Sequence, residues 1–557
     1  MAAPELPPFY YLHNFHQVLR WVRQHSLDLL EPGQLACGDA FLQVSTSAQA
    51  LLVRLIMRKA DVFRTDKLRY AEIPDLPAAV QELSDAGLAQ ADPQLDLDEL
   101  FHLHTLPELR AMFGSLPSGA RKGECRDWVA ARQGMQARPY PAWVCAVHPA
   151  GGLLRLPQAV SQWAQRLQLL FFGNQYQDWS EFVLSDLGLY RYEAIVLDEG
   201  SRAFRHLDDV RLYETLSSLR EAPEQPDAQQ WMERLRAVLD IVTDSDWLRR
   251  RQDKTVFQLG QEAERQAWWE LAEQAYRRST WPGARHRLLR VLERRQDGAA
   301  AWPLFQQAWA QPESEAEAQK LARMLPRLRR LAPQAAELEP APEPTRPLAR
   351  TQLVQLTLPE DGQRVEWQVL AHLHSDLAPV HYVENTLLPG LFGLLCWDAV
   401  FAPLPGAFFH PYQSSPADWG SPDFVARRQD LFDQALAMLD GPSYQGCIRR
   451  RWREKMGMQC PLLAWPALGE TALELALRCI PARHLKAVFR RMLLDWRENR
   501  AGLPDLIRFL PAQGWYELIE VKGPGDRLQD NQRRWLAYFE QHGIPARVCH
   551  VSREPQA

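Results

Sequence analysis

The sequence predicts a multidomain, mainly α-helical protein that ends in an α/β domain. Three observations support this fold class: helical periodicity dominates residues 227–332, a proline-rich segment follows at 333–348, and residues 506–551 have the order strand, strand, helix, strand. With 557 residues, the chain is long enough for several domains of roughly 100 to 200 residues each.

The N-terminal region, residues 1–226, begins with helical stretches separated by a short basic connector. Residues 1–90 resemble a small winged-helix-like module, for which contact with DNA is a reasonable expectation. The connector carries cations that we take as candidate phosphate contacts, namely Arg58, Lys59 and Lys67.

The helical middle, residues 227–332, has tryptophans and Ala/Arg-rich segments at intervals that resemble degenerate tetratricopeptide (TPR) hairpins. A clean repeat of about 34 residues is missing. Stacked hairpins normally scaffold neighbouring domains or bind proteins. We therefore predict that this region positions a substrate and offers a surface for protein partners. The prolines of 333–348 predict a semi-rigid linker after it.

The C-terminal domain, residues 349–557, is predicted to open with two strands, 352–357 and 364–370, around a Pro-Glu-Asp-Gly turn. Glu384 is predicted to begin a strongly apolar helix, and the alternative to a functional role is that this acid only complements the helix dipole. The apolar residues that this helix must bury are Leu387, Leu388, Leu391, Phe392, Leu394, Leu395 and Trp397.

A hairpin near the C-terminus is predicted to bring three polar residues together. Residues 506–509 and 516–522 have the pattern of two strands joined by a turn. Because side chains alternate along a strand, Glu520 and Lys522 point to one face, and the hairpin returns Asp505 towards both.

Two acids and one lysine at this spacing suggest phosphodiester cleavage. Hard cations such as Mg²⁺ or Mn²⁺ prefer oxygen ligands, and two carboxylates leave positions open for water and phosphate oxygens. A bound metal acts as a Lewis acid and lowers the pKa of its water. Lys522 would stand beside the scissile phosphate or orient the attacking water. The alternative is a turn aspartate and a weak ion pair on a solvated strand.

An amphipathic helix is predicted directly after the hairpin. Asp526 is expected to cap this helix, with Gln529 three residues on as in a capping box. Gln532 lies on the same helical face as Trp535. A closing strand at 547–551 completes an α/β core whose open edge carries the polar residues.

These segments resemble a known family. The VRR-NUC branch of the PD-(D/E)xK nucleases resembles this chain at Gly502-Leu503-Pro504-Asp505, at Glu520-Val521-Lys522-Gly523-Pro524-Gly525-Asp526-Arg527-Leu528 and at the helical glutamine Gln532. Fanconi anaemia-associated nucleases, members of that branch, are similar also at Tyr10-Tyr11-Leu12, at Lys67-Leu68-Arg69-Tyr70 and at the upstream metal-binding segment Val383-Glu384-Asn385-Thr386. The similarity therefore spans most of the chain.

The resemblance implies a C-terminal α/β PD-(D/E)xK nuclease core in an enzyme that cuts 5′ flaps, trims DNA in the 5′-to-3′ direction and serves repair of interstrand crosslinks. Glu384, Asp505 and Glu520 would be metal ligands, together with the Val521 carbonyl, for two ions of Mg²⁺ or Mn²⁺. Lys522 would be the catalytic lysine, and Gln532 would complete the catalytic set. Branched or flapped DNA would be the substrate.

Two further features follow from the same resemblance. A SAP-like pair of helices is expected over 98–133, with phosphate contacts from Arg121, Lys122 and Arg126. The family's pocket for a 5′ phosphate lies in the helical middle, where the cations considered are Arg285, Arg287 and Lys320. The ubiquitin-binding zinc finger of the animal enzyme is not expected in this chain.

The net charge of −5 requires an uneven charge distribution in a DNA-binding protein, because phosphate neutralisation needs clustered Lys and Arg. A basic amphipathic helix is predicted just before the hairpin. Its candidate phosphate contacts are Arg490, Arg491 and Arg497. A merely solvated helix face is the alternative.

Several classes of protein are set aside. The eight cysteines form no Cys-x-x-Cys pair, and phosphate-loop, zinc-protease and nucleophile-elbow motifs are missing. Pro389 and Asp398 break the most apolar run well below the ~20 residues of a spanning helix. We therefore predict no membrane segment and, without a visible leader sequence, a cytoplasmic enzyme, associated with the nucleoid if bacterial.

Two alternatives to a flap nuclease stay open. One is a Holliday-junction resolvase of the same branch, against which the long N-terminal half argues. The other is a catalytically silent DNA-binding scaffold, against which the retention of the three acids, Lys522 and Gln532 argues.

Overall fold

The computed structural model describes residues 7–58, 60–143, 152–177, 179, 190–223, 227–333, 352–359 and 362–553. Lys59 and the predicted linker beyond residue 333 lie outside the described residues. The chain divides into two compact units, residues 1–191 and 192–557.

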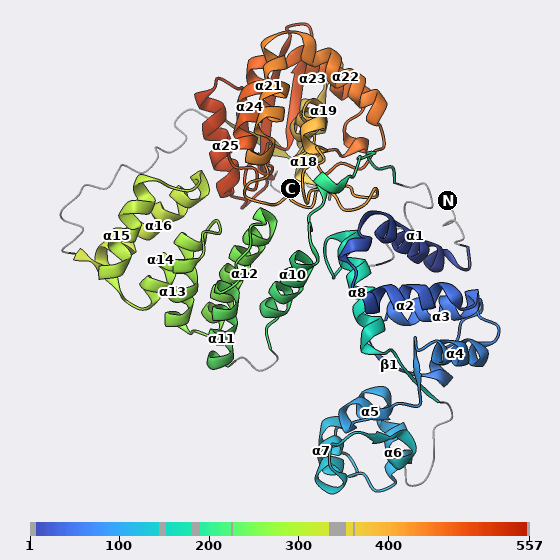
Figure 1. The fold of residues 1–557 in the computed structure, drawn as a ribbon. Coiled ribbons are helices and arrows are strands. Elements are labelled where there is room, and N and C mark those ends of the chain that lie inside the picture. The colour runs from blue at the N-terminus through green and yellow to red at the C-terminus, as the bar shows by residue number, and fades with distance from the viewer. Residues whose placement is uncertain are drawn as a thin grey trace. The chain divides into compact units, whose positions relative to one another are not determined.

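Unit 1 is largely helical (Figure 1). Its described helices are α1 (Tyr10–His25), α2 (Pro32–Gln43), α3 (Thr46–Ile56), α4 (Leu76–Asp85), α5 (Leu97–Leu103), α6 (Leu106–Phe113), α7 (Lys122–Gln133) and α8 (Gln158–Phe172). The two short helices predicted within 98–133 correspond to α6 and α7. The short strands β3 (Gln94–Leu95) and β4 (Arg138–Pro139) pair with each other on either side of α5 to α7 in the chain.

The sheet of unit 1 is completed from outside the predicted winged-helix-like segment. β5 (Leu153–Arg155) lies between β1 (Val62–Arg64) and β2 (Gln90–Ala91), antiparallel to both. A strand from beyond residue 150 therefore joins the first ninety residues, which local sequence patterns do not reveal because the pairing spans the SAP-like helices.

Unit 2 begins with helices that stand side by side (Figure 1). They are α10 (Leu207–Arg220), α11 (Ala228–Leu239), α12 (Asp246–Arg265), α13 (Trp269–Arg278), α14 (Ala284–Arg294), α15 (Gly298–Ala310) and α16 (Glu315–Leu331). Leu216 of α10 shares one core with Trp231 and Tyr276, so packing groups α10 with this helical region rather than with residues 1–226. A Cβ on Gly260 would lie 2.6 Å from the Tyr276 ring, so glycine allows α12 and α13 to approach closely.

The C-terminal part of unit 2 is built on a five-stranded sheet in the order β6-β10-β9-β8-β7. β10 is parallel to β6 and β9, whereas β8 is antiparallel to β9 and β7. The strands are β6 (Gln352–Leu358), β7 (Val380–Tyr382), β8 (Leu506–Leu510), β9 (Trp515–Lys522) and β10 (Ala546–Arg553).

Helices cover both faces of this sheet. One apolar cluster combines Leu506, Ile519 and Val521 with Val369 of α18 (Val365–Leu373). The opposite face, which carries Ile507, packs against the other helices of the domain. These are α19 (Leu387–Leu395), α20 (Trp397–Val400), α21 (Gln429–Ala437), α22 (Ser443–Lys455), α23 (Glu470–Cys479), α24 (Ala482–Leu494) and α25 (Asp530–Gln541).

One predicted strand is wrong, because residues 364–370 belong largely to helix α18. Val365, Val369 and Leu373 recur at four-residue intervals and all face the cluster on one side of the sheet. A window ending at residue 370 is too short to separate this helical period from strand alternation.

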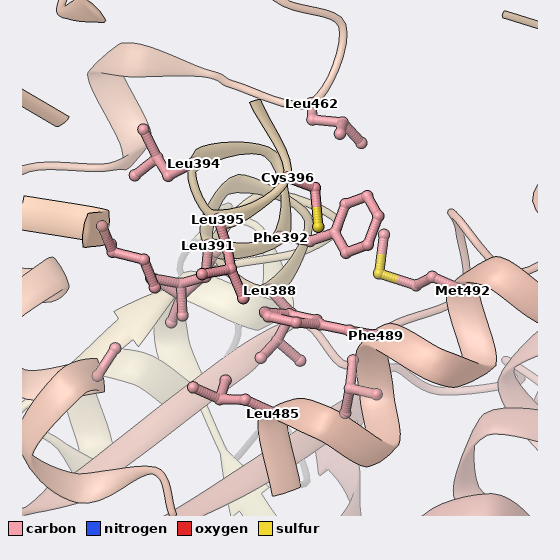
Figure 2. Packing of buried hydrophobic residues seen from close by; sticks show 14 of the residues in the cluster. Leu388, Leu391, Phe392, Leu394, Leu395, Cys396, Leu462, Leu485, Phe489 and Met492 are labelled. Carbon is pink, nitrogen blue, oxygen red and sulfur yellow. The ribbon is translucent and has the colours of Figure 1, made fainter. Parts of the chain in front are cut away.

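The apolar helix predicted from Glu384 onwards is α19, and it is buried as expected. Phe392 packs edge-on against Phe489 of α24, with ring centroids 5.3 Å apart. Figure 2 shows this contact among the leucines of α19 and Met492. None of the helices in the described residues is both long and apolar enough to cross a bilayer.

Candidate active site

The register of the C-terminal hairpin places the predicted acids next to each other. Leu506 pairs with Ile519, so Asp505 and Glu520 are adjacent at the same end of the two strands. Asp505 Oδ2 accepts a hydrogen bond of 2.8 Å from the Val521 N–H. Only 7% of Asp505 and 1% of Glu520 is exposed, so both carboxyl groups are shielded from bulk water.

Lys522 lies beside Glu520. Its Nζ is 2.6 Å from Glu520 Oε1, an ion-pair distance, although the angles do not meet hydrogen-bond geometry. Lys522 is itself buried, with 8% exposed. Because side chains alternate along β9, Val521 points away from this pair into the cluster under α18.

β7 carries Glu384 to the hairpin from far upstream. Tyr382 pairs with Leu506, and the Val383 N–H donates to the Asp505 carbonyl at 2.8 Å. Asn385, whose φ of 50° makes a sharp turn, accepts the Leu503 N–H at 3.2 Å. Two hydrogen bonds therefore fasten the Glu384 segment to the backbone around Asp505.

Glu384 itself lies in this turn, between β7 and α19, rather than in a helix. Tyr382 was not predicted to be part of the site, yet its hydroxyl donates a hydrogen bond to the Glu384 carboxylate. Tyr382 also stacks on Trp367, with centroids 5.6 Å apart. The short strand that ends at Tyr382 could have revealed this contact, because side chains two positions apart in an extended chain point to the same side.

Burial and mutual repulsion disturb the titration of the two hairpin acids. Burial raises the pKa of Asp505 to about 6, with the Glu384 charge adding to the rise, while the Val521 N–H and Lys522 oppose it. Burial, and next the Asp505 charge, raise the pKa of Glu520 to about 7, and Lys522 limits that rise. Both pKa values therefore lie close to neutral pH.

The side chain of Gln532 has a partner within its own helix terminus. Gln529, and not Asp526, is the N-cap of α25, and Gln532 Oε1 accepts the Gln529 N–H at 2.9 Å. Asp526 Oδ2 instead accepts the Gly523 N–H at 3.0 Å and closes the turn after β9. The predicted cap lies one turn too early, because Asp526 and Gln529 are both polar residues that stand three positions before a glutamine.

The donor chemistry of this site fits a hard divalent cation. Its acids present only oxygen atoms, and Glu520 Oε1 is buried with no hydrogen-bond donor. Within the described residues, no three Asp, Glu, His or Cys side chains converge closely enough to surround an ion as they stand.

Of the predicted DNA contacts, Arg491 is placed differently from the expectation. It is 2% exposed, its guanidinium contacts both Glu315 oxygens, and it lies over the Trp535 and Tyr538 rings. The remaining described contacts keep surface positions. Arg58, Lys67, Arg121, Lys122, Arg490 and Arg497 are exposed, and Arg126 is half-buried in an ion pair with Asp98.

Two of the three cations considered for a 5′ phosphate are ion-paired with glutamates. Arg285 pairs with Glu317, and Arg287 with Glu264, each at 2.5 Å. Lys320 instead lines a cleft of about 610 Å³ between α14 and α16. The other residues lining that cleft are His286, Arg290, Glu293, Arg294, Gln296, Arg323, Met324 and Arg327.

Sequence models of three domains match the chain. They are described as "FAN1, HTH domain" over residues 9–90, "Fanconi anemia-associated nuclease SAP domain" over 94–143 and "VRR-NUC domain" over 442–553. A Fanconi-associated nuclease 1 homolog of Pseudomonas aeruginosa is 45% identical over 99% of this chain and 97% of its own length. The chain belongs to the Fanconi-associated nuclease family.

Other Fanconi-associated nucleases are more distant. The human protein is 24% identical over 97% of this chain, which spans 62% of the human length. A crystal structure of paFAN1 bound to DNA with a 2-nucleotide 5′ flap and a gap is 43% identical, covers both chains completely and has a TM-score of 0.84. The predicted family and fold class are confirmed, and the chain is a metal-dependent DNA nuclease.

Proposed function

We propose that this nuclease cuts 5′ flaps near the branch point, trims the 5′-ended strand and acts in repair of interstrand crosslinks. The proposal is supported by relatives whose solved structures hold 5′-flap DNA with a gap. The observation that supports it within this chain is the fastening of the Glu384 segment to the backbone around Asp505, because that contact brings a third acid to the edge of the sheet that carries the hairpin.

The acids would hold two ions of Mg²⁺ or Mn²⁺, with Glu384, Asp505 and Glu520 as carboxylate ligands and Val521 contributing its carbonyl. When bound, such ions polarise the phosphate and supply a more acidic water. Tyr382 keeps the Glu384 carboxylate in place through its hydroxyl. Lys522 would stabilise the charge that develops on the phosphate, and Gln532 would assist from α25.

Substrate grip would come from the exposed cations of the chain. Arg58, Lys67, Arg121, Lys122 and Arg490 carry charge that phosphates can neutralise. The cleft at Lys320 is the better location for a 5′ phosphate, because Arg285 and Arg287 are already paired with acids. Binding of protein partners by the helical middle and a cytoplasmic location stay predictions.

Cleavage of defined DNA tests the proposal. Purified protein with Mn²⁺ is incubated with labelled 5′-flap, four-way-junction and plain duplex DNA, and the assay is repeated with Asp505→Ala. We expect flap cutting near the branch by the unaltered protein and none by the variant, with DNA binding retained. Glu540→Gln, an exposed acid on α25, is the matched control and should cut normally.

Two outcomes would contradict the proposed activity. Symmetric cleavage of the four-way junction in preference to the flap would identify a resolvase. Binding of all three substrates without cleavage at any Mn²⁺ or Mg²⁺ concentration would identify a silent scaffold.

A further inference from the structure

Basic side chains from separate segments of unit 2 gather around the indole of Trp281, in the loop between α13 and α14. Lys254 Nζ, on α12, lies 5.5 Å from the centre of this ring, and the Arg497 guanidinium carbon lies 5.9 Å from it. Arg220, at the end of α10, and Arg251, one turn before Lys254, act electrostatically on the Lys254 ammonium. We call Arg220, Arg251, Lys254 and Arg497 the Trp281 cluster.

Within the described residues, Arg220, Lys254 and Arg497 form no ion pair with a carboxylate, since no acidic oxygen lies within 4.0 Å of their charged nitrogens. Asp253 is next to Lys254 in sequence, but its oxygens accept the Thr280 N–H at 2.8 Å and the Thr280 hydroxyl at 2.9 Å. The acid therefore anchors the loop that carries Trp281 instead of offsetting the positive charge.

A second acid near the cluster is also occupied. Asp495, two residues before Arg497, is half-buried and accepts the Glu498 N–H at 3.2 Å. It attracts Arg497, yet it does not reach ion-pair distance within the described structure. The guanidinium groups stay protonated at any physiological pH, so the cluster keeps its repulsion in the free protein.

The titration of Lys254 reports that repulsion. Burial lowers the pKa of its ammonium, and Arg220, Arg251 and Arg497 lower it further, with no acid raising it. Arg500 is a further cation near Arg497, because burial and the Arg497 charge both lower the pKa of Arg500. Arg500 is not among the charges that lower the pKa of Lys254. The cations of the Trp281 cluster come from α10, α12 and the segment after α24, so a chain of successive anions can be contacted from several elements at once.

We propose that the Trp281 cluster binds consecutive phosphates of the DNA backbone, at a position outside the catalytic hairpin. The inference rests on the proposed function only in that DNA is the substrate. Arg497 links the Trp281 cluster to the nuclease domain, since it lies eight residues before Asp505 in the chain. Lys254 belongs to the helical middle, and Arg220 belongs to α10, which packs with it. A strand held there is contacted by both parts of unit 2 at once.

Equilibrium DNA binding in EDTA, measured by fluorescence anisotropy over a range of salt concentrations, tests this site. We expect Lys254→Gln/Arg497→Gln to lower affinity about tenfold near 0.1 M salt and to reduce the slope of log K against log salt by about two, one for each lost phosphate contact. The charge-conserving variant Lys254→Arg/Arg497→Lys should keep the slope. Arg236→Gln, an exposed arginine on α11, is the matched control and should bind like the unaltered protein.

Thermal unfolding separates a binding role from a structural one. Removal of two mutually repelling charges should leave the melting temperature of the DNA-free protein unchanged or raise it, whereas loss of a structural contact would lower it. A fall in melting temperature for the Gln pair, shared by the charge-conserving pair, would overturn the inference. So would a loss of affinity confined to DNA that carries a 5′-terminal phosphate, because backbone phosphates are present with or without that group.

The outcomes also distinguish this inference from the proposed function. If the unaltered protein fails to cut flaps but the Gln pair still loses two units of salt slope, the flap activity is wrong and the phosphate site stands. If flaps are cut and the slope of the Gln pair equals that of the unaltered protein, the phosphate site is wrong and the flap activity stands.

Discussion

The catalytic hairpin and the Trp281 cluster both hold like charges close together, but they relieve the repulsion differently. Asp505 and Glu520 have raised pKa values of about 6 and about 7, so protons can neutralise part of their charge near neutral pH. The guanidinium groups of the Trp281 cluster cannot lose a proton in that range. Without a bound cation, the acidic site is therefore partly neutralised by protons. Without a bound anion, the guanidinium groups of the basic site stay fully charged.

Arg491 provides a third case, a cation that already has its counter-charge. It is buried, paired with both oxygens of Glu315 and covered by two aromatic rings. This pair joins α24 to α16, and a second ion pair joins Arg323 of α16 to Asp530 of α25. Together they bind the helical middle to the nuclease core, so an arginine predicted to hold DNA instead holds two parts of the protein together.

The largest effect should come from removing the charges of the hairpin. We expect Lys522→Ala and Asp505→Asn each to reduce the single-turnover rate of flap cleavage by about 10²- to 10³-fold or more, because the lost groups act on the reacting phosphate and the metal. Flap affinity measured in EDTA should change little. A rate within threefold of the unaltered protein for either variant would remove that residue from the catalytic set.

The next effect separates a paired cation from an unpaired one. Arg491→Met should lower the free energy of unfolding by about 2 kcal/mol, since it leaves Glu315 without a partner and removes contacts with Trp535. Arg490→Gln, on the exposed neighbouring position, should change it by less than about 0.5 kcal/mol. Urea unfolding of both variants measures the difference. Equal stability would mean that the Arg491 pair contributes nothing.

The raised pKa values predict a pH dependence of cleavage. At Mn²⁺ concentrations below saturation, the rate should rise about tenfold per pH unit between about pH 6 and 7 and more steeply below pH 6, because Asp505 and Glu520 must both lose protons before they bind a cation. Saturating Mn²⁺ should shift the profile to lower pH by competing with protons. A profile that is flat between pH 5 and 7 at low Mn²⁺ would show that neither acid titrates in this range.

The smallest effect concerns the stability of the metal-free protein. The folded-state pKa of Asp505 is above its unfolded value, so the folded protein binds the proton more tightly, and stability falls as pH rises from about 4 through about 6. Asp505→Asn should escape this loss and be more stable by about 1 kcal/mol at pH 8 in EDTA. At pH 4 the gain should vanish. Thermal unfolding at the two pH values tests the sign.

Much of the candidate site could be predicted from local sequence patterns. The strand alternation around Glu520 and Lys522, with Asp505 before the preceding strand, was enough to predict that the three converge, because a hairpin is a local structure with a definite register. The start of α25 was less predictable. Asp526 and Gln529 are both suitable caps, and the choice between them depends on how the turn at Gly523 closes.

Some elements could not be predicted because the sequence window was too short or because the pairing partner was too far away in the chain. Residues 364–370 fit a strand over a short window, whereas the helical period of α18 becomes clear only when Leu373 is included. The sheet of unit 1 needs β5 from beyond residue 150, and the pairing of β1 with β5 has no local signature.

The sequence by itself determined the family, the nuclease hairpin and the residue types of its site, because these depend on neighbours within a few turns of chain. Only the tertiary structure decided that Glu384 is fastened to Asp505, that Arg491 faces Glu315 rather than solvent, and that Lys254 and Arg497 share one indole. Each of these contacts joins segments more than a hundred residues apart. Their formation depends on which helices and strands pack together, and periodicity along the chain does not encode that choice.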